Sequence, residues 1–208
     1  MAQSRRLLKL LFSLRRYGTV RDRDLINALQ SELKYEQSSN PYQKHLGGSL
    51  GDFVLDWDAP QSQDVVLRRK YGMGEEIAVS ALLGPEAFEE EEGALPRKAF
   101  MKVCMRKPGL SSVLQFDCGL FSRGADGSDF DIRNAYYLQS VGLGALDYKG
   151  PSFRSLDPEL QKAFKEYLVA RGITEELTNF LLLHLHKKEL LQYVSWLHRL
   201  KTMVVTDA

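Results

Sequence analysis

The chain has 208 residues, of which 44 % are hydrophobic and 26 % are charged, and its net charge is +1. This length and composition predict one globular domain, alone or with a flexible arm, and supply ample apolar material for a core. The longest apolar patch, residues 180–185, is far shorter than the ~20 residues that a membrane-spanning helix requires, so we expect a soluble protein.

The net charge hides an asymmetry at the N-terminus. Residues 1–21 contain six basic side chains and no acidic one, so the other 187 residues sum to −5. In a helix, the leucines of this stretch would gather on one side and most of its basic side chains on the other. Such an N-terminus is typical of a mitochondrial transit peptide, and the alternative is a basic tail that contacts nucleic acid or membrane. We therefore predict a targeting arm at residues 1–21 and a domain at residues 22–208.

The domain is predicted to begin with a helix and to continue with strands. Apolar residues from Leu25 to Leu33 recur at helical spacing, which predicts a helix that ends at about Gln37. Residues 44–150 then contain short runs rich in β-branched and aromatic residues, and no helix-length pattern lies between them. We therefore expect an antiparallel sheet of about seven strands. The predicted strands span residues 52–57, 64–71, 75–82, 99–106, 112–121 and 130–139, with a short seventh near residue 44 or 146.

Turn signals lie between these strands. Residues 72–75 predict a hairpin turn, and residues 84–96, with four consecutive glutamates, predict a solvated acidic loop. The two cysteines flank a turn at residues 107–109, where Cys104 would lie opposite residues 115–117 and not opposite Cys118. We therefore expect two free thiols in a reducing compartment, and neither a disulfide framework nor a structural zinc site.

Two helices are predicted to close the chain. Asp157 and Pro158 are a start signal for the first, Gly172 is a stop signal, and Thr174 opens the second. In that second helix, residues 179–204 are apolar on more than one side, whereas a surface helix has a single apolar stripe. One helix, an antiparallel sheet and two helices make an α+β domain.

Several segments carry a family resemblance. They are YLVARGI (167–173), the segment 174–183, KELLQY (188–193) and WLHRLK (196–201) near the C-terminus, together with residues 112–118 and DFDIR (129–133) in the sheet region. In this order and at these spacings, over residues 22–204, they resemble the mitochondrial acidic matrix protein family, also called the mitochondrial glycoprotein family. None of them is a catalytic signature.

The resemblance implies a strongly twisted antiparallel sheet, flanked by the N- and C-terminal helices, in a doughnut-shaped homotrimer. It implies a protein of the mitochondrial matrix (the alternative is a plastid) that binds other proteins as a scaffold or chaperone. The implied roles are in mitochondrial ribosome assembly, translation and oxidative phosphorylation. A last helix that is apolar on two faces would then pack on its own sheet and on a neighbouring chain, unless one chain covers it entirely. We infer that the oligomer interface includes Leu25, Leu29, Phe180, Leu183, Leu190, Val194, Trp196 and Leu197.

The sequence departs from the family in its charge. Family members are typically very acidic and carry a long acidic loop, whereas residues 151–208 here hold eight basic and seven acidic side chains. The densest basic run of the domain, Arg68 to Lys70, is a candidate contact for nucleic acid or a ribosome, which is the alternative function. Strand alternation should send Arg69 to one face and Arg68 and Lys70 to the other, and this favours a solvated edge.

No catalytic or ligand-binding pattern stands out. His184 and His186 lie about 200° apart on a helix and should be ordinary interface or surface residues, not a metal pair. Asp126, Asp129 and Asp131 lack the ligand spacing of an EF-hand and predict a solvated turn before a strand. The glycine pairs are too short for a phosphate loop, and no nucleophile motif occurs. We therefore expect neither an enzyme nor a cofactor or metal.

Overall fold

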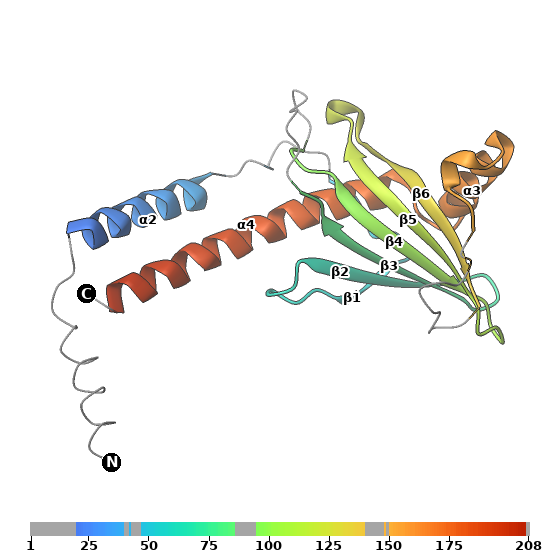
Figure 1. The fold of residues 1–208 in the computed structure, drawn as a ribbon, viewed down its shortest axis with the longest axis horizontal. Coiled ribbons are helices and arrows are strands. Elements are labelled where there is room, and N and C mark those ends of the chain that lie inside the picture. The colour runs from blue at the N-terminus through green and yellow to red at the C-terminus, as the bar shows by residue number, and fades with distance from the viewer. Residues whose placement is uncertain are drawn as a thin grey trace, which may run out of the picture. The chain divides into compact units, whose positions relative to one another are not determined.

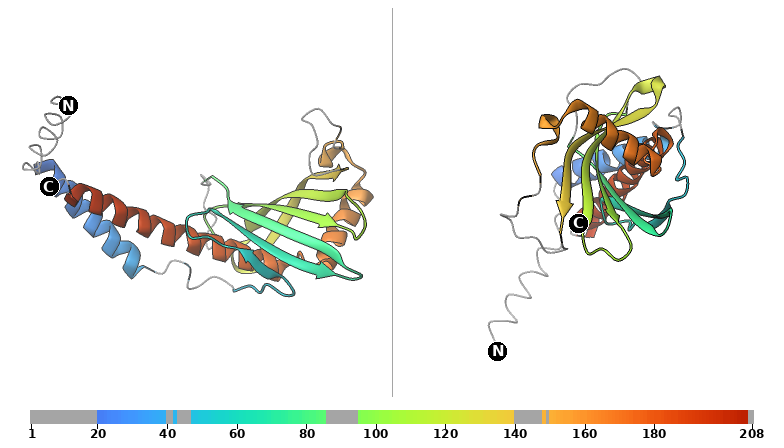
Figure 2. Two further views of the ribbon diagram at one scale, coloured as in Figure 1. Left: turned by 90° about the horizontal axis from the view of Figure 1, so that it is seen from below. Right: turned by 90° about the vertical axis from the view of Figure 1, so that its right-hand side faces the viewer.

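The computed structural model describes residues 20–39, 42, 47–85, 95–139, 148 and 150–206 (Figures 1 and 2). The chain divides into two compact units, a smaller one of residues 1–43 with 189–208 and a larger one of residues 44–188. Three sequence predictions lie outside the described residues: the arm up to residue 19, the run of four glutamates, and the seventh strand near residue 44 or 146.

The larger unit contains, within the described residues, an antiparallel sheet of six strands in sequential order. The strands are β1 (Val54–Trp57), β2 (Asp64–Tyr71), β3 (Glu75–Leu83), β4 (Ala99–Arg106), β5 (Val113–Ser122) and β6 (Ser128–Leu138). Every strand begins and ends within two residues of its predicted bounds, and the predicted hairpin turn joins β2 to β3. The α+β fold class is confirmed.

Alternation gives the sheet one buried face and one exposed face. In β4 the odd-numbered residues from Ala99 to Met105 are buried, whereas those between them are exposed or half-buried. The buried face forms one core with α3 (Pro158–Ala170) and with the N-terminal half of α4 (Glu175–Thr206) (Figure 1). The helical end of the chain supplies Leu168, Ile173, Leu177, Leu181, Leu182 and Leu185 to this core.

A β-bulge interrupts the pairing of β5 with β6. Asp117 lies opposite Asn134, but Cys118 lies opposite Ile132, so Arg133 is an extra residue of β6. After Ile132, the bulge reverses which residues of β6 face the core, so that odd-numbered residues replace even-numbered ones. The alternation of inward and outward side chains along β5 continues unchanged. The sequence pattern did not predict it.

The two cysteines lie on opposite faces of the sheet. Cys104 lies opposite Gln115 on the exposed face, as predicted, whereas Cys118 lies opposite Met101 in the core. Both thiols are free. Burial raises the pKa of each thiol, that of Cys118 to about 12, so both stay protonated at neutral pH.

The ends of α3 follow its predicted signals. The side chain of Asp157 accepts a hydrogen bond from the backbone N–H of Glu159 at 2.9 Å, and Pro158 occupies the first turn. At the other end Gly172 has a φ of +92°, and the N–H groups of Gly172 and Ile173 donate to carbonyls of the last turn. A residue with a side chain would be strained at Gly172, and this is why the stop signal could be recognised.

In the smaller unit, α2 (Val20–Ser38) runs in the opposite direction to the C-terminal half of α4 (Figures 1 and 2). Leu29 and Leu33 of α2 are buried with Leu197 of α4, and Val194 and Leu200 pack beside them. None of the described helices combines the length and the apolar character that a bilayer crossing requires.

Candidate functional site

The residues inferred for an oligomer interface separate into distinct groups. Leu29 and Leu197 are buried within the chain, and Val194 packs partly buried beside them. Leu25 and Trp196 remain about half exposed, at 48 % and 52 % of their surface. The first group packs α2 against α4, and only the second group keeps about half of its surface exposed.

Phe180, Leu183 and Leu190 belong to neither group. Phe180 packs on the core of the sheet and stacks on the His184 ring, with the ring centroids 5.3 Å apart. Leu183 and Leu190 are half-buried, the first in the larger unit and the second in the smaller. The eight inferred residues therefore do not form one surface within the chain.

Two exposed side chains beside Trp196 were not selected from the sequence. Tyr193, Trp196 and Met203 lie within about 80° of one another around α4, and we call them the α4 patch. The Tyr193 ring stacks on Trp196 with centroids 5.9 Å apart, and its hydroxyl donates to Glu32 at 3.0 Å. This hydrogen bond raises the pKa of Tyr193. A helical wheel could not single out the patch, because the position of α2 decides which apolar side chains remain uncovered.

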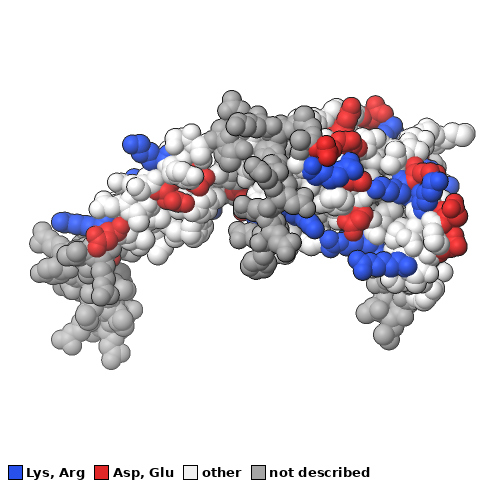
Figure 3. Space-filling view, turned by 90° about the horizontal axis from the view of Figure 1, so that it is seen from above, with Lys and Arg blue, Asp and Glu red and all other residues white. Residues whose placement is uncertain are grey.

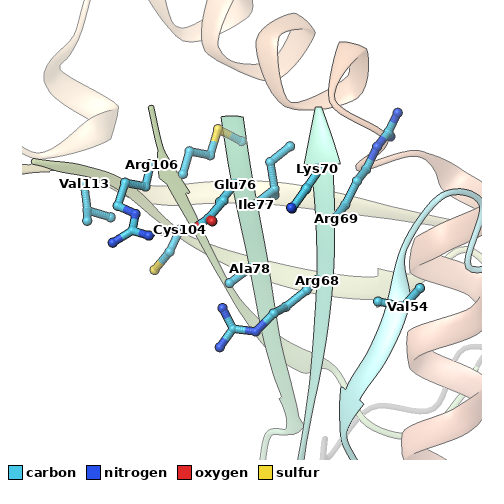
Figure 4. A pocket seen from close by; sticks show the side chains of 11 residues that line it. Val54, Arg68, Arg69, Lys70, Glu76, Ile77, Ala78, Cys104, Arg106 and Val113 are labelled. Carbon is cyan, nitrogen blue, oxygen red and sulfur yellow. Dashed lines mark hydrogen bonds and ion pairs between the residues drawn. The ribbon is translucent and has the colours of Figure 1, made fainter. Parts of the chain in front are cut away.

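A second surface is a hollow of about 550 Å³ on the exposed face of the sheet (Figure 4). β3 and β4 place the small side chains of Ala78 and Cys104 opposite each other, in the same cross-strand row as Arg68. In a neighbouring row on the same face, Glu76 lies opposite Arg106. Long charged side chains therefore surround a floor of small ones. The lining residues are Val54, Arg68, Arg69, Lys70, Glu76, Ile77, Ala78, Cys104, Met105, Arg106 and Val113.

Two arginines at this hollow are already paired with carboxylates. Arg68 Nε donates to Asp56 at 2.6 Å, and Arg106 Nη2 donates to Glu76 at 2.7 Å. The hydrogen bond to Asp56 raises the pKa of the Arg68 guanidinium. All four side chains are exposed, so each pair contributes only about 0–1 kcal/mol to stability. Elsewhere too, on the face shown in Figure 3, basic and acidic side chains of the sheet unit are interspersed.

Arg69 does not belong to a basic surface. Its side chain points away from that of Arg68 in Figure 4, and only 15 % of the side-chain surface is exposed to solvent. The guanidinium packs near the rings of Phe53 and Tyr71. It pairs with Asp52 at 2.7 Å. The predicted alternation is confirmed, and the run Arg68 to Lys70 is therefore divided between the interior and the exposed face.

A neighbouring arginine completes this interior cluster. Arg171 Nε donates to Glu75 at 2.8 Å, and its guanidinium lies 3.4 Å from the centroid of the Tyr167 ring. Burial alone would lower the pKa of Arg171, but the hydrogen bond to Glu75 outweighs it and raises that pKa. The pair joins the end of α3 to the start of β3, so we assign it a structural role.

The two histidines of α4 have separate roles within the chain. His186 is fully buried; its Nδ1 lies 2.7 Å from the Leu182 carbonyl, and its Nε2 accepts from the backbone N–H of Arg97 at 3.3 Å. The prediction of an interface or surface residue is therefore wrong for His186. Its two ring nitrogens satisfy buried backbone groups, which the sequence pattern does not reveal.

His184 belongs to a polar cluster around Asp58. Asp58 lies 2.8 Å from His184 Nε2 and 2.5 Å from the Lys188 ammonium group, which also donates to the Asp64 carbonyl at 2.8 Å. Burial alone would raise the pKa of Asp58, but the hydrogen bonds from Lys188 and His184 outweigh it and lower the pKa below 3.8. This cluster ties the residues after β1 to α4.

The acidic turn before β6 is structural as well. A short 3-10 helix, Gly124–Asp126, forms the predicted turn before the strand, but Asp129 and Asp131, which were predicted to lie in that turn, belong to β6 itself. Asp129 pairs with Lys165 at 3.0 Å, whereas Asp131 lies 3.7 Å from Arg133. Throughout the described ranges, no three His, Cys, Asp or Glu side chains converge as they would around a metal ion.

Sequence relatives cover most of this chain. The mitochondrial acidic protein mam33 of Schizosaccharomyces pombe is 28 % identical over 215 residues, which cover 85 % of this chain and 76 % of that protein. An uncharacterised protein of Arabidopsis thaliana, named as mitochondrial, is 28 % identical over 203 residues, covering 89 % of this chain and 78 % of that protein.

Solved structures share the fold. The crystal structure of the p22 protein of Trypanosoma brucei has a TM-score of 0.67 at 22 % identity, covering 89 % of this chain and 100 % of that one. A Leishmania major protein, described as a sequence homologue of human p32, has a TM-score of 0.66 at 18 % identity, covering 89 % and 99 %. The model of the mitochondrial glycoprotein family matches residues 85–204, which is more than half of the chain. The chain therefore belongs to the mitochondrial glycoprotein family.

Proposed function

We propose that this protein is a non-enzymatic, homotrimeric scaffold of the mitochondrial matrix that binds other proteins. Membership of the mitochondrial glycoprotein family and the mitochondrial names of both relatives support the organelle. Within this role, chaperone-like work in mitochondrial ribosome assembly, translation and oxidative phosphorylation is the finer proposal. The basic N-terminal arm supports import.

The observation that carries the proposal is the α4 patch. Trp196 and Met203 keep 52 % and 64 % of their surface exposed although α2 already covers the adjacent leucine side of the helix. Large apolar side chains grouped on one exposed face mark an interaction site in a soluble protein. We assign the patch to contacts between copies of this chain, and the surfaces of the resulting trimer to partner proteins.

The alternative is a nucleic-acid or ribosome-binding module that uses Arg68, Arg69 and Lys70. Tight binding to a polyanion requires several unpaired cations in one surface. Here Arg69 points to the interior and Arg68 is paired with Asp56, so the run retains only Lys70 as an exposed cation without a carboxylate partner among the described residues. This geometry disfavours the alternative.

Light scattering on the purified protein tests the trimer. We expect a mass near three times 23.7 kDa, less any cleaved arm. Capture of partners from isolated mitochondria, with the Trp196→Ala variant as a second bait, should yield matrix proteins that depend on the assembled form. A wild-type protein that stays monomeric at micromolar concentration contradicts the trimer. If the protein without residues 1–21 still binds nucleic acid, and this binding weakens steeply as salt is added, the result favours the alternative.

A fluorescent fusion of residues 1–30 tests the location separately. Import into mitochondria with a shortened product is the expected result, because the basic amphipathic arm has the features of an import signal. Diffuse cytosolic fluorescence contradicts the targeting role, and plastid import identifies the other organelle.

A further inference from the structure

We propose that the hollow on the exposed face of the sheet is a docking site for an extended acidic peptide of a partner protein. A carboxylate of the peptide lies between Arg68 and Arg106, and a neighbouring aliphatic side chain covers Ala78 and Cys104. This proposal names a class of partner for the protein-binding role and rests on that role.

The shape of the hollow follows from the strand register. Ala78 and Cys104 are direct cross-strand partners, so their Cβ atoms lie only about 5 Å apart, and neither side chain extends far from the sheet. Arg68 lies beside Ala78 in the same row, and Arg106 follows Cys104 two residues later on the same face. Two long side chains therefore bound a depression floored by a methyl group and a thiol (Figure 4).

The charges around the depression match a carboxylate. Among the described lining residues on this face, Arg68, Lys70 and Arg106 are basic and Glu76 is acidic. Asp56, next to the hollow, pairs with Arg68, so the surplus is about one positive charge, which suits a single carboxylate of the peptide. Arg68 uses its Nε for Asp56, and Arg106 uses Nη2 for Glu76. A guanidinium has five N–H donors in a planar fork, so both arginines retain donors for a further carboxylate.

The apolar part of the lining favours a peptide over a nucleic acid. Val54 lies on β1, the edge strand of the described sheet, keeps 63 % of its surface exposed and lines the hollow on one side, and Val113 of β5 also lines it. Single-stranded nucleic acids bind where bases stack on aromatic rings, and no aromatic residue is among the described lining residues. A peptide in which acidic and aliphatic side chains alternate matches a lining that contains both basic and aliphatic residues.

The extent of the lining favours a peptide over a small carboxylate. Pockets for small molecules bury most of the ligand in a concave site. This hollow extends over residues from β1 to β5 on the surface of the sheet. An extended chain can make contacts along such a surface, whereas a small acid would leave most of it uncovered.

Fluorescence anisotropy on the purified full-length protein tests the proposal. The probes are a fluorescein-labelled peptide of alternating leucine and glutamate, the same peptide with glutamine in place of glutamate, and a labelled oligothymidylate. The variants are Arg106→Gln, which removes a charge, and Ala78→Leu, which fills the hollow without changing charge. Lys102→Gln is the matched control, because Lys102 is exposed on β4 but does not line the hollow.

We expect the wild-type protein to bind the glutamate peptide about tenfold more tightly than the glutamine peptide, since charge-assisted hydrogen bonds are the stronger class. Arg106→Gln should remove that preference, and Ala78→Leu should lower the affinity for both peptides at least tenfold. Lys102→Gln should change binding less than about twofold. Unfolding curves and light scattering of each variant establish that fold and assembly are retained.

Other outcomes overturn the proposal. Absence of peptide binding at about 1 mM, or equal losses in Lys102→Gln and Arg106→Gln, excludes a specific acidic-peptide site. Binding of oligothymidylate that Arg106→Gln abolishes, without peptide binding, assigns the hollow to nucleic acid instead. If the trimer and its captured partners persist while the peptides fail to bind, this proposal fails and the scaffold function stands.

Discussion

Replacing Trp196 or Leu197 of α4 by alanine should separate folding from assembly. Leu197 is 2 % exposed and lies buried with Leu29 and Leu33 of α2. Trp196, the preceding residue, is 52 % exposed and stacks on Tyr193. Adjacent residues on a helix point about 100° apart, so the two substitutions affect different surfaces.

The magnitudes follow from burial. Leu197→Ala removes buried methyl groups and should lower the stability of the smaller unit by about 2–5 kcal/mol. For Trp196, about half of a side chain of roughly 200 Å² remains to be covered by a neighbour. At about 25 cal/mol per Å², that is ~2.5 kcal/mol per protomer and ~7.5 kcal/mol per trimer. The trimer dissociation constant should then rise by about five orders of magnitude.

Sedimentation equilibrium over a dilution series measures the assembly, and denaturant unfolding measures stability. Trp196→Ala should be monomeric at concentrations where the wild type is a trimer, with the stability of its chain lowered by at most about 2.5 kcal/mol, because the half of the ring that its own chain covers has a similar area. Leu197→Ala should unfold more easily at every concentration. A Trp196→Ala variant that stays trimeric at all dilutions contradicts the proposed interface. A Trp196→Ala variant whose chain is destabilised more than that of Leu197→Ala contradicts the assignment of Leu197, and not Trp196, to the contact between α2 and α4.

Three further predictions concern the larger unit. Gly48→Ala should lower stability by more than about 2 kcal/mol, because a Cβ there would overlap the backbone of α4, while Gly47→Ala, where a Cβ meets nothing, is the control in the same unfolding assay. Thiol titration at pH 8 should label Cys118 only on unfolding and Cys104 slowly before it, since burial raises both pKa values; one intramolecular disulfide would contradict the strand register. The lowered pKa of Asp58 stabilises the fold above the unfolded value of 3.8, and this contribution is lost as the pH falls below it; acid unfolding of Asp58→Asn should lack this component, and an unchanged pH profile would contradict it.

Much of the fold could be predicted because its signals are local. Strand bounds were recognisable from alternation and turn residues, and α3 from Asp157 at its start and Gly172 at its end. The position of Cys104 opposite Gln115 followed from the length of one turn. The bulge at Arg133 was missed, because an extra residue in a strand leaves no compositional trace.

The candidate surfaces were predicted less well, because exposure depends on partners that are distant in the sequence. The wheel of α4 showed apolar side chains all around the helix, and only the position of α2 decided that Leu197 is covered while Trp196 is not. The pleat divides the basic run on β2 as alternation predicted, but only the packing of the core decided that Arg69 is the residue that points inward. The hollow had no sequence signal, since Ala78 and Cys104 meet only through strand pairing.

The sequence by itself determined the element order, the α+β class, the free cysteines and the family, because propensity, alternation and motif spacing are properties of short segments. Tertiary structure alone decided which apolar faces remain uncovered, which arginine turns inward, and that His186 is buried. Burial of a side chain is a relation between segments far apart in the chain, and the register that brings those segments together is set by packing of the whole core.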